Sequence, residues 1–208
     1  MSDLVVHDVV IVGAGPVGLF LAIELETAGV KPLVLERLVE PDDGIKAAAV
    51  GAAGAEALER RGFAGALDEQ QVTLPMAKAA RAGAGPVKKP GGHFSALFVI
   101  DQDLQRAPER HSRMVPQEAL ERILAERASE LGIEIRRGVE VEGFEQDDDG
   151  VRVRTSAGPL SARYLIGCDG GRSSVRKLAG FEFPGAGSRW RVSSRTTTAC
   201  ACGRARAR

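Results

Sequence analysis

Three glycines near the start of the chain have the spacing that holds a dinucleotide. The segment Asp8–Gly18 reads Asp-Val-Val-Ile-Val-Gly-Ala-Gly-Pro-Val-Gly, so an apolar, β-branched run leads directly into Gly13, Gly15 and Gly18. In this motif the first glycine allows a tight turn, the second lets backbone amides approach a pyrophosphate, and the third lets a helix lie against the strand. The N-terminus of that helix then favours the negative charge of the phosphates.

An acidic residue follows the glycines at the distance typical of dinucleotide-binding folds. Glu36 stands eighteen residues after Gly18 and ends a second apolar run, Lys31–Leu35. Its carboxylate can therefore accept hydrogen bonds from a pair of ribose hydroxyls. We include the neighbouring Pro16 and Arg37 in the expected cofactor site.

A second motif lies near the other end of the patterned sequence. The segment Tyr164–Arg176 reads Tyr-Leu-Ile-Gly-Cys-Asp-Gly-Gly-Arg-Ser-Ser-Val-Arg, which predicts a buried strand, a turn at Asp169 and Gly170, and then a helix. An acid at such a turn can accept a hydrogen bond from a ribityl or ribose hydroxyl, or it can hold the amides of the loop. The plainer alternative is a strand–turn–helix in which Asp169 is only the N-cap.

The residue pattern predicts the strands and helices that would position both motifs. Residues 64–92 are rich in Ala, Gly and Pro and predict loops with at most one short strand. Helices are expected at Pro16–Ala28, Ala47–Gly62 and Pro116–Leu131. Strands are expected at His7–Val12, Pro32–Glu36 and Phe94–Ile100, followed by four short strands at Ile133–Arg136, Glu140–Gln146, Val151–Thr155 and Ala162–Ile166.

Composition narrows the class of protein. The chain has 208 residues with 28 basic and 28 acidic side chains, but residues 185–208 hold six arginines and no acid. Residues 1–184 therefore carry 22 bases against 28 acids, which argues against nucleic acid as a partner. The apolar runs are too short to span a membrane, and no signal peptide is visible. We expect a cytoplasmic protein.

The cysteines do not form a recognisable framework. Cys168, Cys200 and Cys202 are the three in the chain, and their spacing does not indicate disulfides. Cys200 and Cys202 also lack the second cysteine pair or histidine that a metal site would need. No metal site is expected.

The two motifs together resemble the FAD-dependent aromatic hydroxylases, flavoprotein monooxygenases of the p-hydroxybenzoate hydroxylase type, and within them the polyketide-tailoring branch. The resemblance covers about residues 5–185. It implies an α/β fold of the FAD-binding, Rossmann-like kind with three layers (parallel sheet, β-meander and helices), and a substrate domain that is largely missing. Residues 1–184 would be the FAD-binding domain, of which 64–112 would join the sheet of the substrate domain. The further matching segments are Ile45–Ala48, Glu56–Gly62, Met114–Leu124 and Gly180–Gly185.

The resemblance also implies a chemistry. FAD is the expected cofactor and NAD(P)H the co-substrate, for the hydroxylation or epoxidation of a small aromatic or polyketide substrate. No catalytic side chain is expected, because the flavin carries the oxidation. By position, the three glycines would hold the pyrophosphate and Glu36 the adenosine ribose. The other FAD contacts implied are Lys46, Arg113, Gln117, Asp169 and Gly170.

Plainer interpretations of these residues stay open. Lys46 is equally a solvated loop cation, Arg113 an ordinary surface arginine, and Gln117 a solvated residue in a first helical turn. Residues 185–208 lack any apolar period and are typical of an out-of-frame reading of GC-rich DNA or of a disordered basic tail. The weaker alternatives are metal binding by Cys200 and Cys202, and binding of the basic tail to nucleic acid or to an anionic surface.

The expected function is an NAD(P)H-dependent monooxygenase impaired by truncation, with apolar surface left exposed where the missing sheet would pack. One alternative is a non-catalytic FAD-binding module or partner subunit, for which the short length speaks. Another is a related flavin reductase or dehydrogenase. Neither the substrate, the choice between NADPH and NADH, nor the oligomeric state follows from the sequence.

Overall fold

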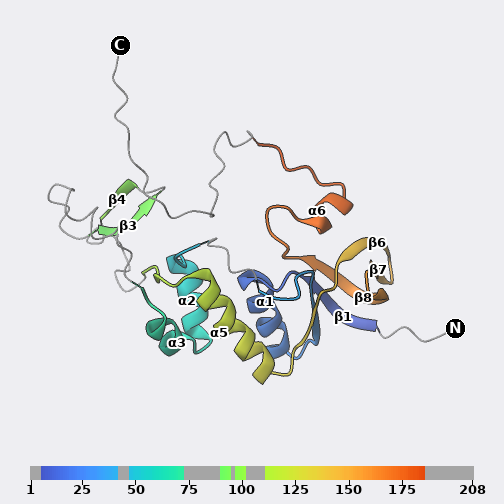
Figure 1. Ribbon diagram of the computed structural model, residues 1–208, viewed down its shortest axis with the longest axis horizontal. Helices are drawn as coiled ribbons and strands as arrows, with labels where there is room; N and C mark the ends of the chain where they lie inside the picture. Colours follow the sequence, from blue (N-terminus) through green and yellow to red (C-terminus); the bar gives the residue numbers. More distant parts are fainter. Residues whose placement is uncertain (1–5, 42–46, 73–89, 95–96, 102–110, 186–208) are drawn as a thin grey trace, which may run out of the picture.

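A six-stranded sheet in the order β5-β2-β1-β8-β7-β6 forms the centre of the protein (Figure 1). The computed structural model describes residues 6–41, 47–72, 90–94, 97–101 and 111–185. Neighbouring strands are parallel from β5 to β8 and antiparallel from β8 to β6. The strands are β1 (Val6–Val12), β2 (Pro32–Glu36), β5 (Glu134–Arg137), β6 (Val141–Asp147), β7 (Gly150–Thr155) and β8 (Gly158–Gly167).

Helices cover one face of the parallel strands (Figure 1). They are α1 (Pro16–Thr27), α2 (Ala52–Arg60), α3 (Ala64–Glu69) and α5 (Gln117–Glu130), while the short α6 (Ser174–Leu178) follows β8. A separate two-stranded sheet pairs β3 (Pro90–Phe94) with β4 (Leu97–Asp101). Among the described residues, no helix combines the length and apolar character needed to cross a bilayer.

Alternating side chains of the parallel strands build two cores. Val9 and Ile11 of β1 face the helices, where they join the buried Leu124 of α5. Val10 and Val12 face the other way and pack with apolar side chains of the antiparallel strands. Burying one such side chain contributes about 1.5–3 kcal/mol, so both faces stabilise the sheet. The result is a layer of helices, the parallel strands and a β-meander, which confirms the predicted three-layer fold.

The first helix begins and ends as its sequence predicts. Gly15 is the N-cap and Pro16 occupies the first turn, where a missing N–H costs nothing. After the last turn the chain passes through Gly29 at φ 81°, a left-handed conformation that favours glycine.

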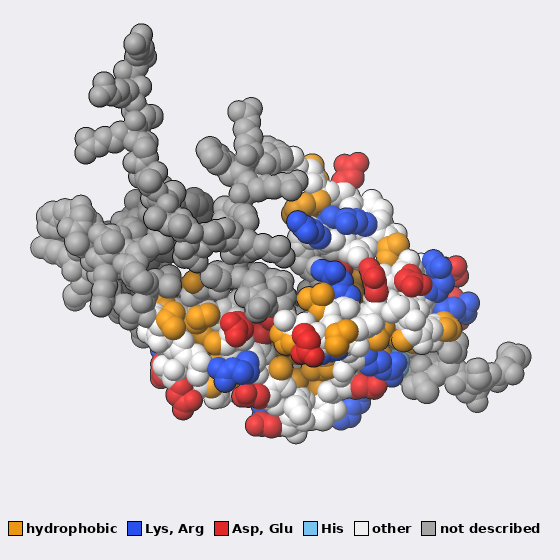
Figure 2. All heavy atoms as spheres, viewed as in Figure 1, with side chains coloured by type: hydrophobic (Ala, Val, Ile, Leu, Met, Phe, Trp, Pro, Cys, Tyr) orange, Lys and Arg blue, Asp and Glu red, His pale blue; other side chains and the backbone are white. Residues whose placement is uncertain are grey.

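Figure 2 shows acidic and basic side chains interspersed over the described part of the visible face.

Two helix predictions need correction. The helix expected over Ala47–Gly62 begins only at Ala52, because Val50 forms an antiparallel bridge with Arg113 instead. The loop expected after residue 64 starts with the helix α3, which is held by the fully buried Leu67. In both places tertiary contacts outweigh local propensity.

The strand predictions need two changes as well. The single strand expected over Phe94–Ile100 is the pair β3 and β4. The strand expected at Ile133–Arg136 is not part of the meander, since β5 pairs in parallel with β2 at the edge of the sheet. The meander therefore consists of β6, β7 and β8. The turn between β6 and β7 is held by Asp147, whose Oδ1 accepts from the amides of Asp149 and Gly150.

Candidate functional site

The two sequence motifs meet at one end of the sheet. Since β1 and β8 are neighbours, Val12 and Gly167 end side by side, and the Cys168 amide donates to the Val12 carbonyl at 2.7 Å. Gly13 turns away at φ 108°, and a Cβ there would lie 2.6 Å from the Cys168 carbonyl oxygen. The turn of the first motif is thus in direct contact with the second, which explains why Gly13 must be a glycine.

Gly18 is required by packing between the helix and the turn. A Cβ on Gly18 would overlap the carbonyl oxygen of Gly13 and lie 3.1 Å from its carbonyl carbon. Its side of α1 can approach the turn only because no side chain intervenes. These distances agree with the role predicted for the third glycine, which is to let the helix pack closely against the strand and its turn.

Gly15 differs from the other two glycines because neither its backbone conformation nor the packing around it requires a glycine. Its φ of −77° is ordinary for any residue. Among the described atoms, a Cβ there would meet only the Glu121 Oε1, at 3.9 Å. The space beside the Gly15 backbone is therefore open, at the N-terminus of α1, where a pyrophosphate is favoured.

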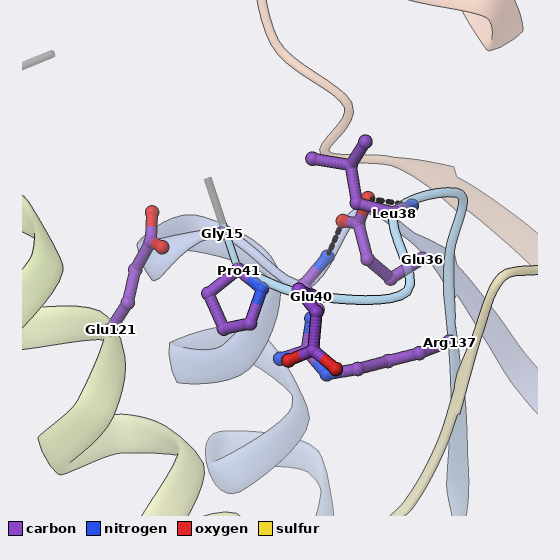
Figure 3. A pocket seen from close by; sticks show the side chains of 8 residues that line it. Gly15, Glu36, Leu38, Glu40, Pro41, Glu121 and Arg137 are labelled. Carbon is purple, nitrogen blue, oxygen red and sulfur yellow. Dashed lines mark hydrogen bonds between the residues drawn. The ribbon is translucent and has the colours of Figure 1, made fainter. Parts of the chain in front are cut away.

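Glu36 is fixed next to the glycine turn by two backbone amides. Its Oε2 accepts from the Ala14 N–H at 2.9 Å, and its Oε1 accepts from the Leu38 N–H at 2.9 Å, as Figure 3 shows. Each carboxylate oxygen has a further lone pair for a hydroxyl donor. The carboxylate is thus oriented toward the side of the turn where a ribose would follow the phosphates.

A pocket opens between Glu36 and the N-terminus of α1 (Figure 3). The lining consists of Ala14, Gly15, Glu36, Leu38, Glu40, Pro41, Glu121 and Arg137. Of these eight, Gly15 and Glu36 were expected as site residues and the other six were not. Glu121 and Arg137 come from segments far from Glu36 in sequence, so no local spacing indicates them.

Asp169 holds the first turn of α6 and keeps one oxygen free. Its Oδ2 accepts from the amides of Ser174 at 2.6 Å and Val175 at 3.3 Å. The N-cap itself is Ser173, whose hydroxyl oxygen accepts from the Arg176 amide at 2.9 Å. Among the described residues, the buried Oδ1 of Asp169 has no hydrogen-bond partner. An unpaired buried acceptor is costly, so this oxygen suits a hydroxyl supplied by a ligand.

The thiol of Cys168 stays neutral beside these groups. Burial raises its pKa, and the negative charge of Asp169 raises it further. The thiol therefore remains protonated at neutral pH and adds no negative charge next to the turn where phosphates would lie.

Gln117 lies one contact away from the glycine turn. Its Nε2 donates to the Glu121 Oε1 at 2.7 Å, and Glu121 reaches the pocket beside Gly15. Among the other expected residues, Gly170 has φ 78°, Pro16 is in the first turn of α1 and Arg37 is exposed. Lys46 lies outside the described residues, so its role stays a prediction.

Arg113 is engaged by acidic side chains of two helices rather than by the pocket. Its Nε donates to the Glu59 Oε1 at 2.8 Å and its Nη1 to the Asp68 Oδ1 at 2.6 Å. The hydrogen bond with Glu59 is the main cause of the raised pKa of the guanidinium. The side chain is only 13% exposed, so it is not an ordinary surface arginine. Its contact with FAD stays a prediction.

The ion pairs of Arg113 lead to a stability prediction. Arg113→Met should lower the free energy of unfolding by about 2 kcal/mol, because it leaves two carboxylates without their shared donor. Arg122→Met is the matched control, since Arg122 is 56% exposed and its replacement should cost less than about 0.5 kcal/mol. Urea unfolding monitored by circular dichroism measures both. Equal midpoints for the two variants would contradict the structural role.

These features fit the dinucleotide that the sequence predicts. The open side of Gly15 would be filled by a Cβ, the Glu36 carboxylate faces the same pocket, and the orphaned Asp169 oxygen lies beyond the turn. The match to a protein family decides the identity of that dinucleotide. Residues 6–203 match the family described as the FAD binding domain. The chain belongs to this family. FAD is therefore its cofactor, as predicted.

The family match extends past Pro184 into the segment 185–208. That segment lies outside the described residues from 186 onward. Its expected origin in an out-of-frame reading therefore stays a prediction, as does the division of the chain into domains.

Similar proteins carry names of monooxygenases and hydroxylases. The chain is 45% identical over 185 residues to a 12-dehydrotetracycline 5-monooxygenase/anhydrotetracycline 6-monooxygenase of Streptomyces rimosus, covering 86% of this chain and 34% of that protein. The solved structure of an anhydrotetracycline hydroxylase from Streptomyces rimosus superposes with a TM-score of 0.73 at 43% identity, covering 88% of this chain and 36% of that one. A complex of aklavinone-11 hydroxylase with FAD and aklavinone has a TM-score of 0.66 at 31% identity, with coverage of 86% and 36%.

The chain thus spans about a third of the length of these relatives. The resemblance to polyketide-tailoring flavin hydroxylases is confirmed, and it concerns the part that carries the FAD-binding fold.

The position of Glu36 leads to a binding prediction. Glu36→Gln should weaken FAD binding at least about tenfold, because a charged acceptor is lost and the new amide opposes the Ala14 or Leu38 N–H. Glu126→Gln, at a side chain of α5 that is 63% exposed, is the control and should bind FAD normally. Quenching of flavin fluorescence gives both dissociation constants, and an unchanged value for Glu36→Gln would refute the ribose contact.

Proposed function

We propose that this chain is the FAD-binding part of an NAD(P)H-dependent monooxygenase that hydroxylates or epoxidises a small aromatic or polyketide substrate. The observation that carries the proposal is the open side of Gly15, facing the pocket of Glu36 in a chain of the FAD binding domain family. The relatives named for tetracycline and aklavinone hydroxylation support the substrate class. When bound, FAD supplies the redox chemistry.

The chain's own residues bind and orient the cofactor in this proposal. Gly13 and Gly18 keep the turn and α1 close together, so that the amides beside Gly15 approach the pyrophosphate. Glu36 accepts from the adenosine ribose. Asp169, followed by Gly170, offers its free oxygen to a hydroxyl on the flavin side. Contacts of Gln117, Lys46 and Arg113 with FAD are part of the same proposal.

A second function is favoured by one feature of the surface. Phe181 and Phe183 are 72% and 74% exposed. Exposed aromatic side chains of this kind are typical of a surface that another protein segment covers, as in an FAD-binding module that acts with a partner subunit. A cytoplasmic location stays a prediction.

A titration of the purified chain with FAD tests the proposal first. Saturable quenching of flavin fluorescence, with a shifted visible absorption band, is expected. The oxidation of NADPH and of NADH by the loaded protein is then followed with and without aromatic substrates. Turnover coupled to hydroxylated product would support the monooxygenase. Binding without any oxidation of either nucleotide favours the module, and a folded chain that does not bind FAD would refute both.

A further inference from the structure

The pocket beside Glu36 ends at an arginine of the edge strand. Arg137 of β5 is paired in register with Glu36 of β2, and residues paired in this way face the same side of a sheet. Its half-buried side chain lines the pocket together with Glu40 and Pro41, as Figure 3 shows.

The Arg137 guanidinium has no partner within the described part of the chain. Neither a hydrogen bond nor an ion pair holds it, although three carboxylates, those of Glu36, Glu40 and Glu121, line the same pocket. The adjacent Arg136 is different: it lies on the opposite face of the sheet, and its Nε donates to the Glu134 Oε1 at 2.8 Å. A half-buried guanidinium without a hydrogen-bond partner keeps its N–H donors and its planar face available for a ligand.

The backbone fixes the distance between Arg137 and Glu36. The Val139 N–H donates to the Glu36 carbonyl at 3.0 Å, and the Gly138 N–H donates to the Leu38 carbonyl at 3.3 Å. The ends of β2 and β5 are therefore tied together, and Arg137 is held relative to the acid rather than carried on a free loop.

The direction of the pocket indicates which group arrives at Arg137. Phosphates belong at the N-terminus of α1 beside Gly15, and the ribose belongs at Glu36. In a nucleotide the base follows the ribose. Beyond Glu36 the pocket continues from β2 to its outer neighbour β5, where Arg137 lies.

We infer that Arg137 forms one wall of the adenine subsite and stacks its guanidinium on the base. This inference rests on the proposed FAD site and adds the residue that recognises the base. A guanidinium is planar, weakly hydrated and suited to stacking on aromatic rings. Among the described residues that line the pocket there is no aromatic side chain, and Arg137 supplies a planar guanidinium there.

The test compares nucleotides that differ in their base. Dissociation constants of FAD, ADP and UDP are measured by calorimetry for the full chain and for Arg137→Ala, Arg137→Lys and Arg136→Ala. Arg137→Ala should weaken FAD and ADP by about tenfold and should reduce the preference for ADP over UDP, because purines offer the larger stacking surface. Arg137→Lys should restore neither the affinity nor the preference for ADP, because lysine carries the positive charge but lacks the planar guanidinium. Arg136→Ala should resemble the wild type.

Three results would overturn the inference. The first is an unchanged affinity of Arg137→Ala for ADP. The second is a wild-type affinity of Arg137→Lys for FAD and ADP, and the third is an equal loss of affinity of Arg137→Ala for ADP and UDP. The second and third results would indicate that Arg137 contributes its charge alone. Wild-type protein that binds neither FAD nor ADP would instead refute the proposed function, and the adenine subsite with it. Wild-type protein that binds both, with an indifferent Arg137→Ala variant, refutes only the role of Arg137.

Discussion

The Gly15→Ala variant is expected to fold like the wild-type protein and to lose most of its affinity for FAD. Within the described part of the chain the added methyl group meets only the Glu121 carboxylate, at 3.9 Å, and the backbone at φ −77° accepts any residue. The same methyl group would occupy the space where a pyrophosphate approaches the amides of the turn. Lost amide contacts to a charged group cost about 1.5–3 kcal/mol, so the dissociation constant should rise about ten- to a hundredfold.

Two measurements on the same preparation decide this prediction. Thermal unfolding without FAD should give a midpoint close to that of the wild type, whereas the fluorescence titration should show weak binding. Wild-type affinity in Gly15→Ala would mean that the phosphates do not lie against this turn.

The Gly18→Ala variant is expected to lose stability even without a cofactor. Its methyl group would overlap the Gly13 carbonyl oxygen, and that carbonyl cannot move freely because the Gly13 turn also contacts Cys168. Either the turn or α1 must shift, at a cost of about 3 kcal/mol or more. The thermal midpoint should fall by roughly 10 °C, and much of the chain should become insoluble on expression.

Gly51→Ala provides the control for this effect. Gly51 is the N-cap of α2, its φ is −65°, and a Cβ there would meet none of the described atoms within 4 Å. Its midpoint should stay within about 3 °C of the wild type. If the Gly18→Ala and Gly51→Ala variants had the same thermal midpoint, the close approach of α1 to the turn would not limit stability.

The sequence predicts the nucleotide-binding unit well because each part is locally encoded. β2 has the expected bounds, Pro32–Glu36, and α1 begins at Pro16 as expected. The alternating Val and Ile residues of β1, the proline in the first helical turn and the glycine after the helix each act within a few residues. Such signals do not depend on the rest of the chain.

Other parts depend on contacts between distant segments. The backbone N–H and C=O of Val50 both form hydrogen bonds with Arg113, at 2.8 and 2.9 Å. The alanine-rich stretch therefore becomes helical only after Val50, at Ala52. β5 joins β2 across nearly a hundred residues, although its sequence is equally suited to the meander. The pocket residues Glu121 and Arg137 follow from that topology, so no local motif could identify them.

The position of β8 determines when the site can exist during synthesis. β8 lies between β1 and β7, and the Cys168 amide that completes the turn follows it directly. When Glu36 has been made, translation of the residues up to 167 still takes on the order of 10 s. Until then one edge of β1 is unpaired, and the faces of Val10 and Leu33 that later pack against the meander are uncovered. A nascent chain therefore exposes an incomplete sheet with apolar side chains and an unpaired edge, and it cannot yet bind FAD. Its yield in the cell should depend on chaperones that cover these surfaces during those seconds.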